Sequence, residues 1–119
     1  PVVAECFGAM GARTGVVGHT HVPAAFVCPE PFRTAGQVFA LQLGPDVPIR
    51  LEEKHRHLLN PGSVGQPRDR NPDAAWALLD TDAATFHVRR VAYEVALTQW
   101  KIRRAGLPDF LGERLRVGA

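Results

Sequence analysis

Residues 15–23 read GVVGHTHVP, and this stretch decides the fold that we expect. The β-branched run at 15–17 is too short for a helix and is typical of a buried strand, which Gly18 ends. Two histidines, His19 and His21, follow on a segment that the flanking glycine and proline keep out of regular pairing. The stretch therefore predicts a buried strand that carries two imidazoles onto a surface loop.

His19 and His21 are candidate metal ligands. Imidazole is the commonest neutral protein ligand for zinc, iron, manganese and similar ions. A rigid strand end lowers the entropic cost of assembling such a site, because it holds both rings in place before the metal arrives. The alternative is a pair of surface histidines in a turn, and the spacing by itself leaves both interpretations open.

A second block follows a short predicted strand at 57–59 and reads NPGSVGQPRD over residues 60–69. Its glycines bring backbone amides close together, and Arg68 offers a planar fork that can pair with a phosphate, with Ser63 as a second candidate in the same turn. The alternative is a strand-ending turn that packs beneath the site. The prolines in the block remove amide donors and favour this alternative.

The rest of the chain predicts a mixture of helices and strands. We expect a helix over 2–12, a strand at 37–43 forming a hairpin with 47–51, an antiparallel pair at 75–79 and 85–91, and helices over 95–105 and 108–115. This order indicates an α/β or α+β sandwich rather than a helical bundle, as a single domain over 1–119. Three aromatic residues fall on apolar periods and are assigned to packing: Trp76, Phe86 and Trp100.

The other histidines and the acidic residues are assigned structural roles. His55 and His57 flank Arg56 and are placed on opposite sides of the chain, in exposed or core positions rather than as ligands. His87 lies inside a strand and is treated in the same way. The aspartates between 69 and 82 stand beside Asn, Pro and Thr, which is typical of turns.

The composition fits a small globular domain. The chain has 119 residues, of which 45% are hydrophobic and 22% charged, a composition that argues against disorder. The net charge of +2 is weak evidence for nucleic-acid binding. The basic residues near the end alternate with apolar ones and indicate the wet face of a helical segment: Lys101, Arg103, Arg104, Arg114 and Arg116.

Cysteine usage and hydropathy point to a cytoplasmic protein. The two cysteines, Cys6 and Cys28, are too few and too far apart for a disulfide framework or a paired-thiol metal site. No stretch approaches the roughly 20 apolar residues of a membrane span, and no secretory leader is visible. Because the chain begins at Pro1 rather than at a methionine, we expect a piece of a longer protein.

The two blocks, GHTH at 18–21 and NPGSVGQPRD at 60–69, closely resemble the last motif and the downstream signature of bacterial calcineurin-like metallophosphoesterases. The resemblance implies a sandwich of two mixed sheets with flanking helices, of which residues 1–119 are the carboxyl-terminal half. It also implies two divalent metal ions (Mn, Fe, Zn or Ni), one bound by His19 and the other by His21, with a carboxylate bridging them.

The earlier motifs of that family, DxH, GDxxD, GNH(D/E) and a further single histidine, have no match in this chain. We therefore expect these 119 residues to be inactive alone, and the complete protein to hydrolyse phosphomonoesters or phosphodiesters, nucleotides among them. The missing amino-terminal half is the expected partner, and self-association through an exposed sheet edge is a further expectation. The alternatives are a non-catalytic scaffold with the same fold and, more weakly, a basic nucleic-acid-binding module.

Overall fold

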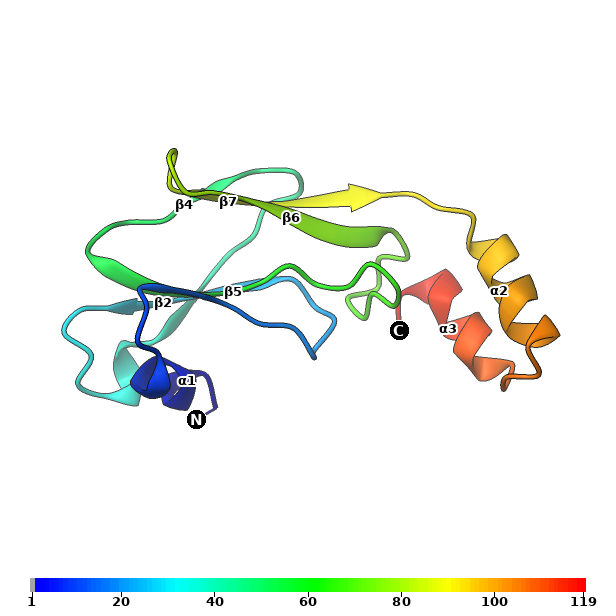
Figure 1. Cartoon of the computed structure of the whole chain (residues 1–119), viewed down its shortest axis with the longest axis horizontal. Coiled ribbons are helices and arrows are strands. Elements are labelled where there is room, and N and C mark those ends of the chain that lie inside the picture. Colours follow the sequence, from blue (N-terminus) through cyan, green and yellow to red (C-terminus); the bar gives the residue numbers. More distant parts are fainter. Residues whose placement is uncertain (1) are drawn as a thin grey trace.

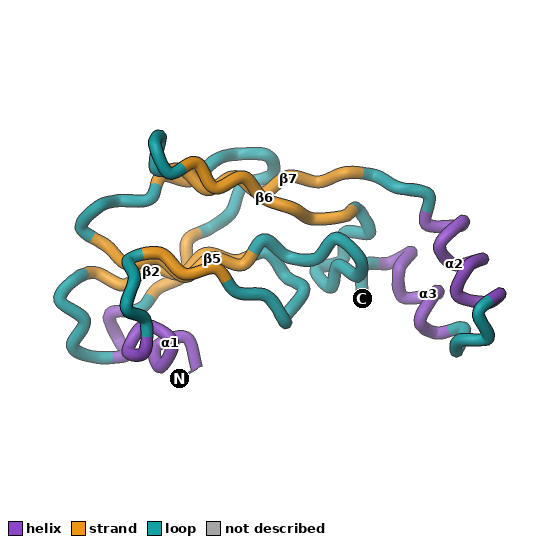
Figure 2. The backbone as a smooth tube through the Cα atoms, in the orientation of Figure 1, coloured by secondary structure: helices purple, strands orange, loops and turns teal. Residues whose placement is uncertain are grey.

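The computed structural model describes residues 2–119, which form two stacked β-sheets with helices below and at one end (Figures 1 and 2). In chain order the elements are α1 (Val2–Ala9), β1 (Thr14–Val16), β2 (Ala24–Pro29), η1 (Ala35–Gln37), β3 (Phe39–Leu41), β4 (Ile49–Arg50), β5 (His55–Asn60), β6 (Ala74–Asp80), β7 (Thr85–Val91), α2 (Val95–Arg104) and α3 (Phe110–Val117). The α/β sandwich predicted from the sequence, with two sheets and flanking helices, is confirmed.

The first sheet has the strand order β1-β5-β2-β3, and the second has the order β4-β7-β6. Strand β1 runs parallel to β5, with Gly15 opposite Leu58, whereas all other pairs are antiparallel. Strand β5 is therefore hydrogen-bonded on both sides. It is the strand around which the first sheet is built.

Alternation along β5 divides the apolar core in two. Leu59 points between the sheets and packs with Phe86 of β7. Leu58, one residue earlier, points to the other face of its sheet and packs with Phe7 of α1 and Cys28 of β2. The two-residue period of one strand thus fixes both the sheet-on-sheet core and the helix that closes the outer face.

The helical hairpin of α2 and α3 extends from one end of the sandwich (Figure 1). The radius of gyration is 16.6 Å, against about 13.5 Å for a compact domain of this length, so the hairpin adds to the long axis. Its end is attached through Gly118, whose carbonyl accepts a hydrogen bond from the Arg70 amide at 2.9 Å. No helix among the described residues has the length and apolarity needed to cross a bilayer.

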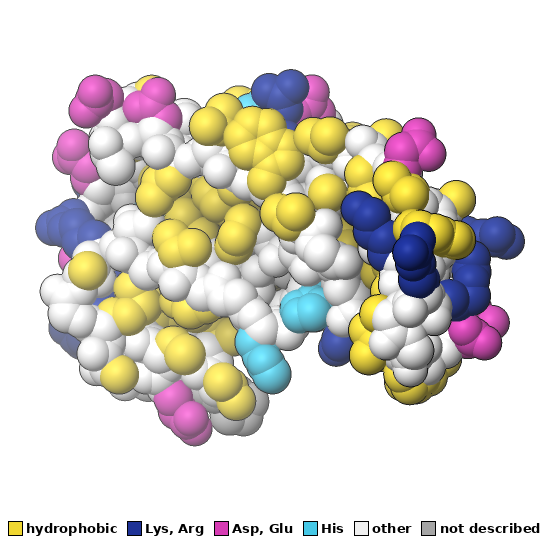
Figure 3. Space-filling model, turned by 45° about the vertical axis from the view of Figure 1, so that its right-hand side comes forward, with side chains coloured by type: hydrophobic (Ala, Val, Ile, Leu, Met, Phe, Trp, Pro, Cys, Tyr) yellow, Lys and Arg dark blue, Asp and Glu magenta, His cyan; other side chains and the backbone are white. Residues whose placement is uncertain are grey.

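Several sequence predictions are confirmed. The helices α1, α2 and α3 lie at or close to the predicted ranges, and β6 and β7 form the predicted antiparallel hairpin. The Asp80 carboxylate accepts hydrogen bonds from the Asp82 and Ala83 amides, as expected for an aspartate in a turn. Several Lys and Arg side chains lie on the helical hairpin (Figure 3), and the basic residues between 101 and 116 are mostly exposed.

The predicted hairpin of 37–43 with 47–51 is wrong. Strand β3 pairs instead with β2, Ala25 standing opposite Leu41, and β4 pairs with β7 in the other sheet, Ile49 opposite Phe86. The connection between them crosses from one sheet to the other rather than turning back. Strand β2 was not predicted, because prolines bracket its short run and two of its six residues are alanines.

Burial also differs from the expectation at three positions. Strand β1 was predicted to be buried, yet Val16 is 57% exposed, because β1 is at the edge of its sheet. Phe86 is in the core as predicted, whereas Trp76 and Trp100 are exposed. Trp76 lies on the outer side of the edge strand β6, and Trp100 lies on the outer side of α2, where the Arg104 guanidinium stacks 5.0 Å from its ring centroid.

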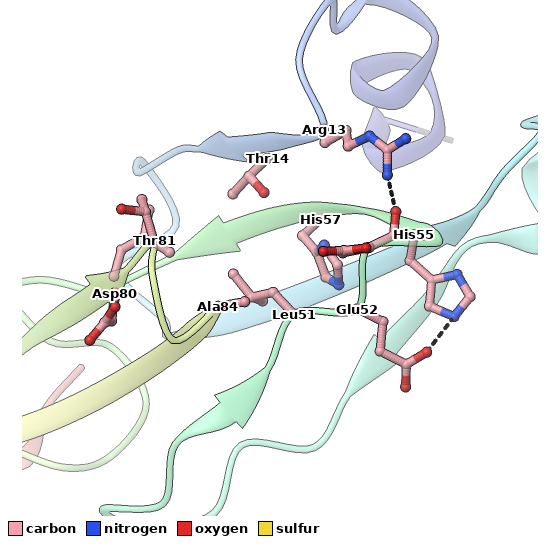
Figure 4. Close-up of a pocket in the computed structure, with 11 residues that line it drawn as sticks. Arg13, Thr14, Leu51, Glu52, His55, His57, Asp80, Thr81 and Ala84 are labelled. Atoms are coloured by element: carbon pink, nitrogen blue, oxygen red, sulfur yellow. Dashed lines mark hydrogen bonds and ion pairs between the residues drawn. The ribbon is translucent and has the colours of Figure 1, made fainter.

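His55 and His57 lie on the same side of β5, not on opposite sides, because residues two apart on a strand share a face. Both line a cavity of about 210 Å³ between the two sheets, with Leu51 on its wall (Figure 4). His57 is buried, and His55 is half-buried with its Nε2 3.3 Å from the Glu52 carboxylate. The prediction of core or exposed roles holds, but the predicted placement does not.

We expect the stability of the fold to fall as the pH drops below about 6.5, because burial lowers the pKa of His57 and the neighbouring His55 lowers it further, against a smaller opposing effect of Glu52. The unfolded chain then binds a proton that the folded chain rejects, so protonation favours unfolding. Denaturant midpoints measured between pH 7.5 and 5.5 check this. A His57→Gln variant should show a shallower decline than a His87→Gln variant, and equal slopes would contradict the prediction.

Candidate metal centre

The loop after β1 holds His19 and His21 in strained backbone conformations. Their φ angles are 76° and 62°, in the left-handed region that side chains other than glycine rarely adopt. The Thr20 amide donates to the Gly18 carbonyl at 3.0 Å and closes a tight turn around His19. The Val22 amide donates to the Thr20 hydroxyl at 3.3 Å and closes a second turn around His21. Each histidine is therefore at the centre of its own turn.

The His21 ring is oriented by a backbone carbonyl. Its Nδ1 lies 2.8 Å from the carbonyl oxygen of Gln66, which can only accept, so in the neutral imidazole Nδ1 carries the proton and Nε2 keeps its lone pair. This is the arrangement found for histidines that bind metals, because the second hydrogen bond fixes the tautomer and the ring plane. His21 is half-buried and His19 is exposed. The loop thus presents one oriented nitrogen donor and one accessible imidazole.

The two sequence blocks meet in space. Because β1 and β5 run side by side in the same direction, the loops that follow them leave the sheet together. Asn60, the last residue of β5, donates through its amide nitrogen to the Gly18 carbonyl at 3.1 Å and to the Thr20 hydroxyl at 2.9 Å. Its amide oxygen accepts from the Gly62 amide at 2.9 Å. The block at 60–69 is therefore built against the histidine loop.

Arg68 and Ser63, the predicted phosphate contacts, both belong to this block. The Arg68 amide donates to the His21 carbonyl at 3.1 Å, and its guanidinium donates to the Gln66 side chain at 3.0 Å. The Ser63 hydroxyl accepts from the Gln66 amide at 2.9 Å. Arg68 is exposed beside the histidine loop, whereas Ser63 is half-buried in the turn. A role for either in binding phosphate stays a prediction.

The Asp69 carboxylate, at the end of this block, is engaged in structure. Asp69 forms an ion pair with Arg90 of β7, and Arg90 also donates to the Asp73 carbonyl at 3.0 Å. This pair ties the end of the second block to the second sheet.

A crystal structure of a metallophosphoesterase from Sphaerobacter thermophilus superimposes on the chain with a TM-score of 0.86 and 36% sequence identity. The match covers 99% of this chain and 47% of that one. The chain has the metallophosphoesterase fold. The resemblance predicted from the sequence is therefore confirmed.

The chain is also similar to an uncharacterized protein of Methanocaldococcus jannaschii, with 39% identity over 102 residues. These residues are 86% of this chain and 38% of that protein. No protein-family model matches the chain. The chain thus spans less than half the length of each of these two proteins.

The donors present fit a part of the metal site that the metallophosphoesterase fold implies. His19 and His21 supply two imidazoles, and the hydrogen bond to Gln66 leaves the His21 Nε2 available. Within residues 2–119 no group of three or more His, Cys, Asp or Glu side chains comes together in a way that could hold a metal ion. A catalytic zinc usually takes three protein ligands, so residues 2–119 supply only some of the donors that such a site needs.

The sequence interpretation missed the supporting residues. Gln66 acts through its carbonyl, which any residue has, so its identity carried no signal. Asn60 did carry a signal. An asparagine at a strand end before Pro-Gly is typical of an Asx-turn, in which the side-chain oxygen accepts a hydrogen bond from the backbone amide two residues later. Its contact with the histidine loop depends on the pairing of β1 with β5, 40 and more residues apart in sequence.

Proposed function

We propose that the complete protein is a metal-dependent phosphoesterase in which His19 and His21 each bind one of two divalent metal ions, Mn, Fe, Zn or Ni. The observation that carries this proposal is the hydrogen bond from the His21 Nδ1 to the Gln66 carbonyl, within a metallophosphoesterase fold. A pair of divalent cations, when bound, supplies Lewis acidity and an activated water for attack on a phosphoester.

The residues of this chain have separate tasks in that reaction. The two imidazoles offer neutral nitrogen donors, and the Gln66 carbonyl holds one of them in the required tautomer. Arg68 pairs with phosphate oxygens through its guanidinium, and Ser63 donates its hydroxyl hydrogen to the same group. The substrate is a phosphomonoester or phosphodiester, with nucleotides as one class, in the cytoplasm.

Metal removal tests the proposal on the complete protein. We expect dialysis against a chelator to lower the hydrolysis of an aryl phosphate or an aryl phosphodiester by at least about ten-fold, and added Mn²⁺ to restore it. Residues 1–119 alone are expected to be inactive, because they provide too few ligands. Undiminished turnover after complete metal removal would contradict the proposed function.

A non-catalytic scaffold is the second candidate, and it rests on the small number of metal donors within residues 2–119. On this interpretation the exposed apolar side chains of the edge strand β6, Trp76 and Leu78, bind the other half of the protein or a second copy. A complete protein that retains no metal and hydrolyses neither aryl substrate would favour the scaffold.

A further inference from the structure

The backbone of the histidine loop, residues 18–23, adopts conformations that its residues do not favour on their own. His19 and His21 both have positive φ angles, which are unfavourable for residues with a side chain and persist only where the surrounding structure enforces them. The hydrogen bond from the Thr20 amide to the Gly18 carbonyl makes a γ-turn centred on His19. A γ-turn whose central residue has a positive φ is rare and strained. Some group outside the loop must therefore stabilise this conformation.

Asn60 is placed to do so. Its side chain is buried, and its amide nitrogen donates to the Gly18 carbonyl and to the Thr20 hydroxyl, the groups on either side of His19. The same hydroxyl accepts the Val22 amide that closes the turn around His21. One side chain on a central strand is thus bonded to both strained turns.

We infer that Asn60 is a positioning residue of the metal site, acting through Gly18 and Thr20 to hold the imidazoles of His19 and His21 in place for metal. This inference rests on the proposed function. The required chemistry is that of a donor, because the Gly18 carbonyl can only accept. Asparagine supplies both hydrogens at one position and still offers its oxygen to the Gly62 amide.

The isosteric change Asn60→Asp separates positioning from simple turn formation. A carboxylate keeps the acceptor for Gly62 but loses both donors to the loop. Asn71→Asp is the matched control, because the Asn71 oxygen accepts the Asp73 amide in the same kind of turn. Thr20→Val removes the hydroxyl that links the two turns, at an exposed position where folding is retained, and Thr20→Ser is its conservative partner.

The readout is the affinity of the metal-free complete protein for Mn²⁺ and Zn²⁺, measured by chelator competition beside thermal unfolding of the metal-free form. We expect Asn60→Asp to weaken binding by about 10–100-fold, the range for residues that orient metal ligands, although it adds a negative charge. Thr20→Val should weaken binding by about ten-fold with little change in the unfolding midpoint. The double variant should be about as weak as Asn60→Asp alone, because both changes break one network.

Nuclear magnetic resonance of the imidazole nitrogens adds a readout that metal binding does not control. In the metal-free wild-type protein the His21 ring should carry its proton on Nδ1, and in Thr20→Val and Asn60→Asp this preference should weaken. The inference would be overturned if Asn60→Asp and Asn71→Asp had equal affinities for metal. It would also be overturned if Thr20→Val and Thr20→Ser did. A wild-type protein that binds no divalent metal would overturn the proposed function, and the inference with it.

Discussion

Replacing His21 with alanine is expected to lower the phosphoesterase turnover of the complete protein by more than about 100-fold. Loss of a residue that merely orients a ligand costs about 10–100-fold, so loss of the ligand itself should cost more. The His21 ring lies on a loop, is half-buried and makes one hydrogen bond, to the Gln66 carbonyl. Its removal should therefore leave the unfolding midpoint of the metal-free protein close to that of the wild type.

The matched control is His87→Ala. The His87 Nε2 lies 2.9 Å from the carboxylate of Asp46, a largely exposed residue, and a polar contact of this kind contributes at most about 1 kcal/mol. This variant should keep both turnover and metal content. If His21→Ala and His87→Ala hydrolyse an aryl phosphate at the same rate, His21 is not a metal ligand and the proposed function fails.

The local features of this site were predictable from the sequence because they depend on short-range chemistry. The run at 15–17 ends at Gly18 in a loop with two histidines, and the strand at 57–59 ends in Asn-Pro-Gly; both predicted strands overlap observed ones, β1 and β5. Each conclusion needed only a few neighbouring residues. The resemblance of the two blocks to metallophosphoesterases then indicated the fold.

The pairing of strands was not predictable in the same way. Nothing local to β1 says that its partner is β5, or that the pair is parallel, since the contact joins residues more than 40 positions apart. The same limit explains the wrong hairpin. The apolar runs at 37–43 and 47–51 are separated by only a few residues, yet the backbone groups of each are hydrogen-bonded in a different sheet. Exposure of Val16 and Trp76 follows from their strands being at sheet edges, which is also a long-range property.

Replacing Gly62 with alanine is expected to lower the free energy of unfolding by about 2–5 kcal/mol. Gly62 has a φ of 89°, and placing a side chain in a left-handed conformation costs about 1–2 kcal/mol. An added Cβ would also lie 2.8 Å from the Pro23 ring and 2.9 Å from the Ala75 Cβ. Neither neighbour can rotate away, because one is a proline ring and the other is the first carbon of a side chain. Relieving the overlap should therefore cost about 1–3 kcal/mol more, the usual cost of overpacking.

Gly65→Ala, three residues away in the same block, is the control. Among the residues that the structure describes, leaving out its chain neighbours, no heavy atom lies within 4 Å of the position that a Cβ at Gly65 would take, and its φ is not in the left-handed range. Urea denaturation of the metal-free complete protein should place the two variants at least about 2 kcal/mol apart. Equal stabilities would mean that the close approach of Gly62 to Pro23 is not required. Pro23 ends the histidine loop, and the Gly62 amide donates a hydrogen bond to the Asn60 side chain. The strain of Gly62→Ala therefore falls on the residues that hold His19 and His21, so metal affinity should fall together with stability.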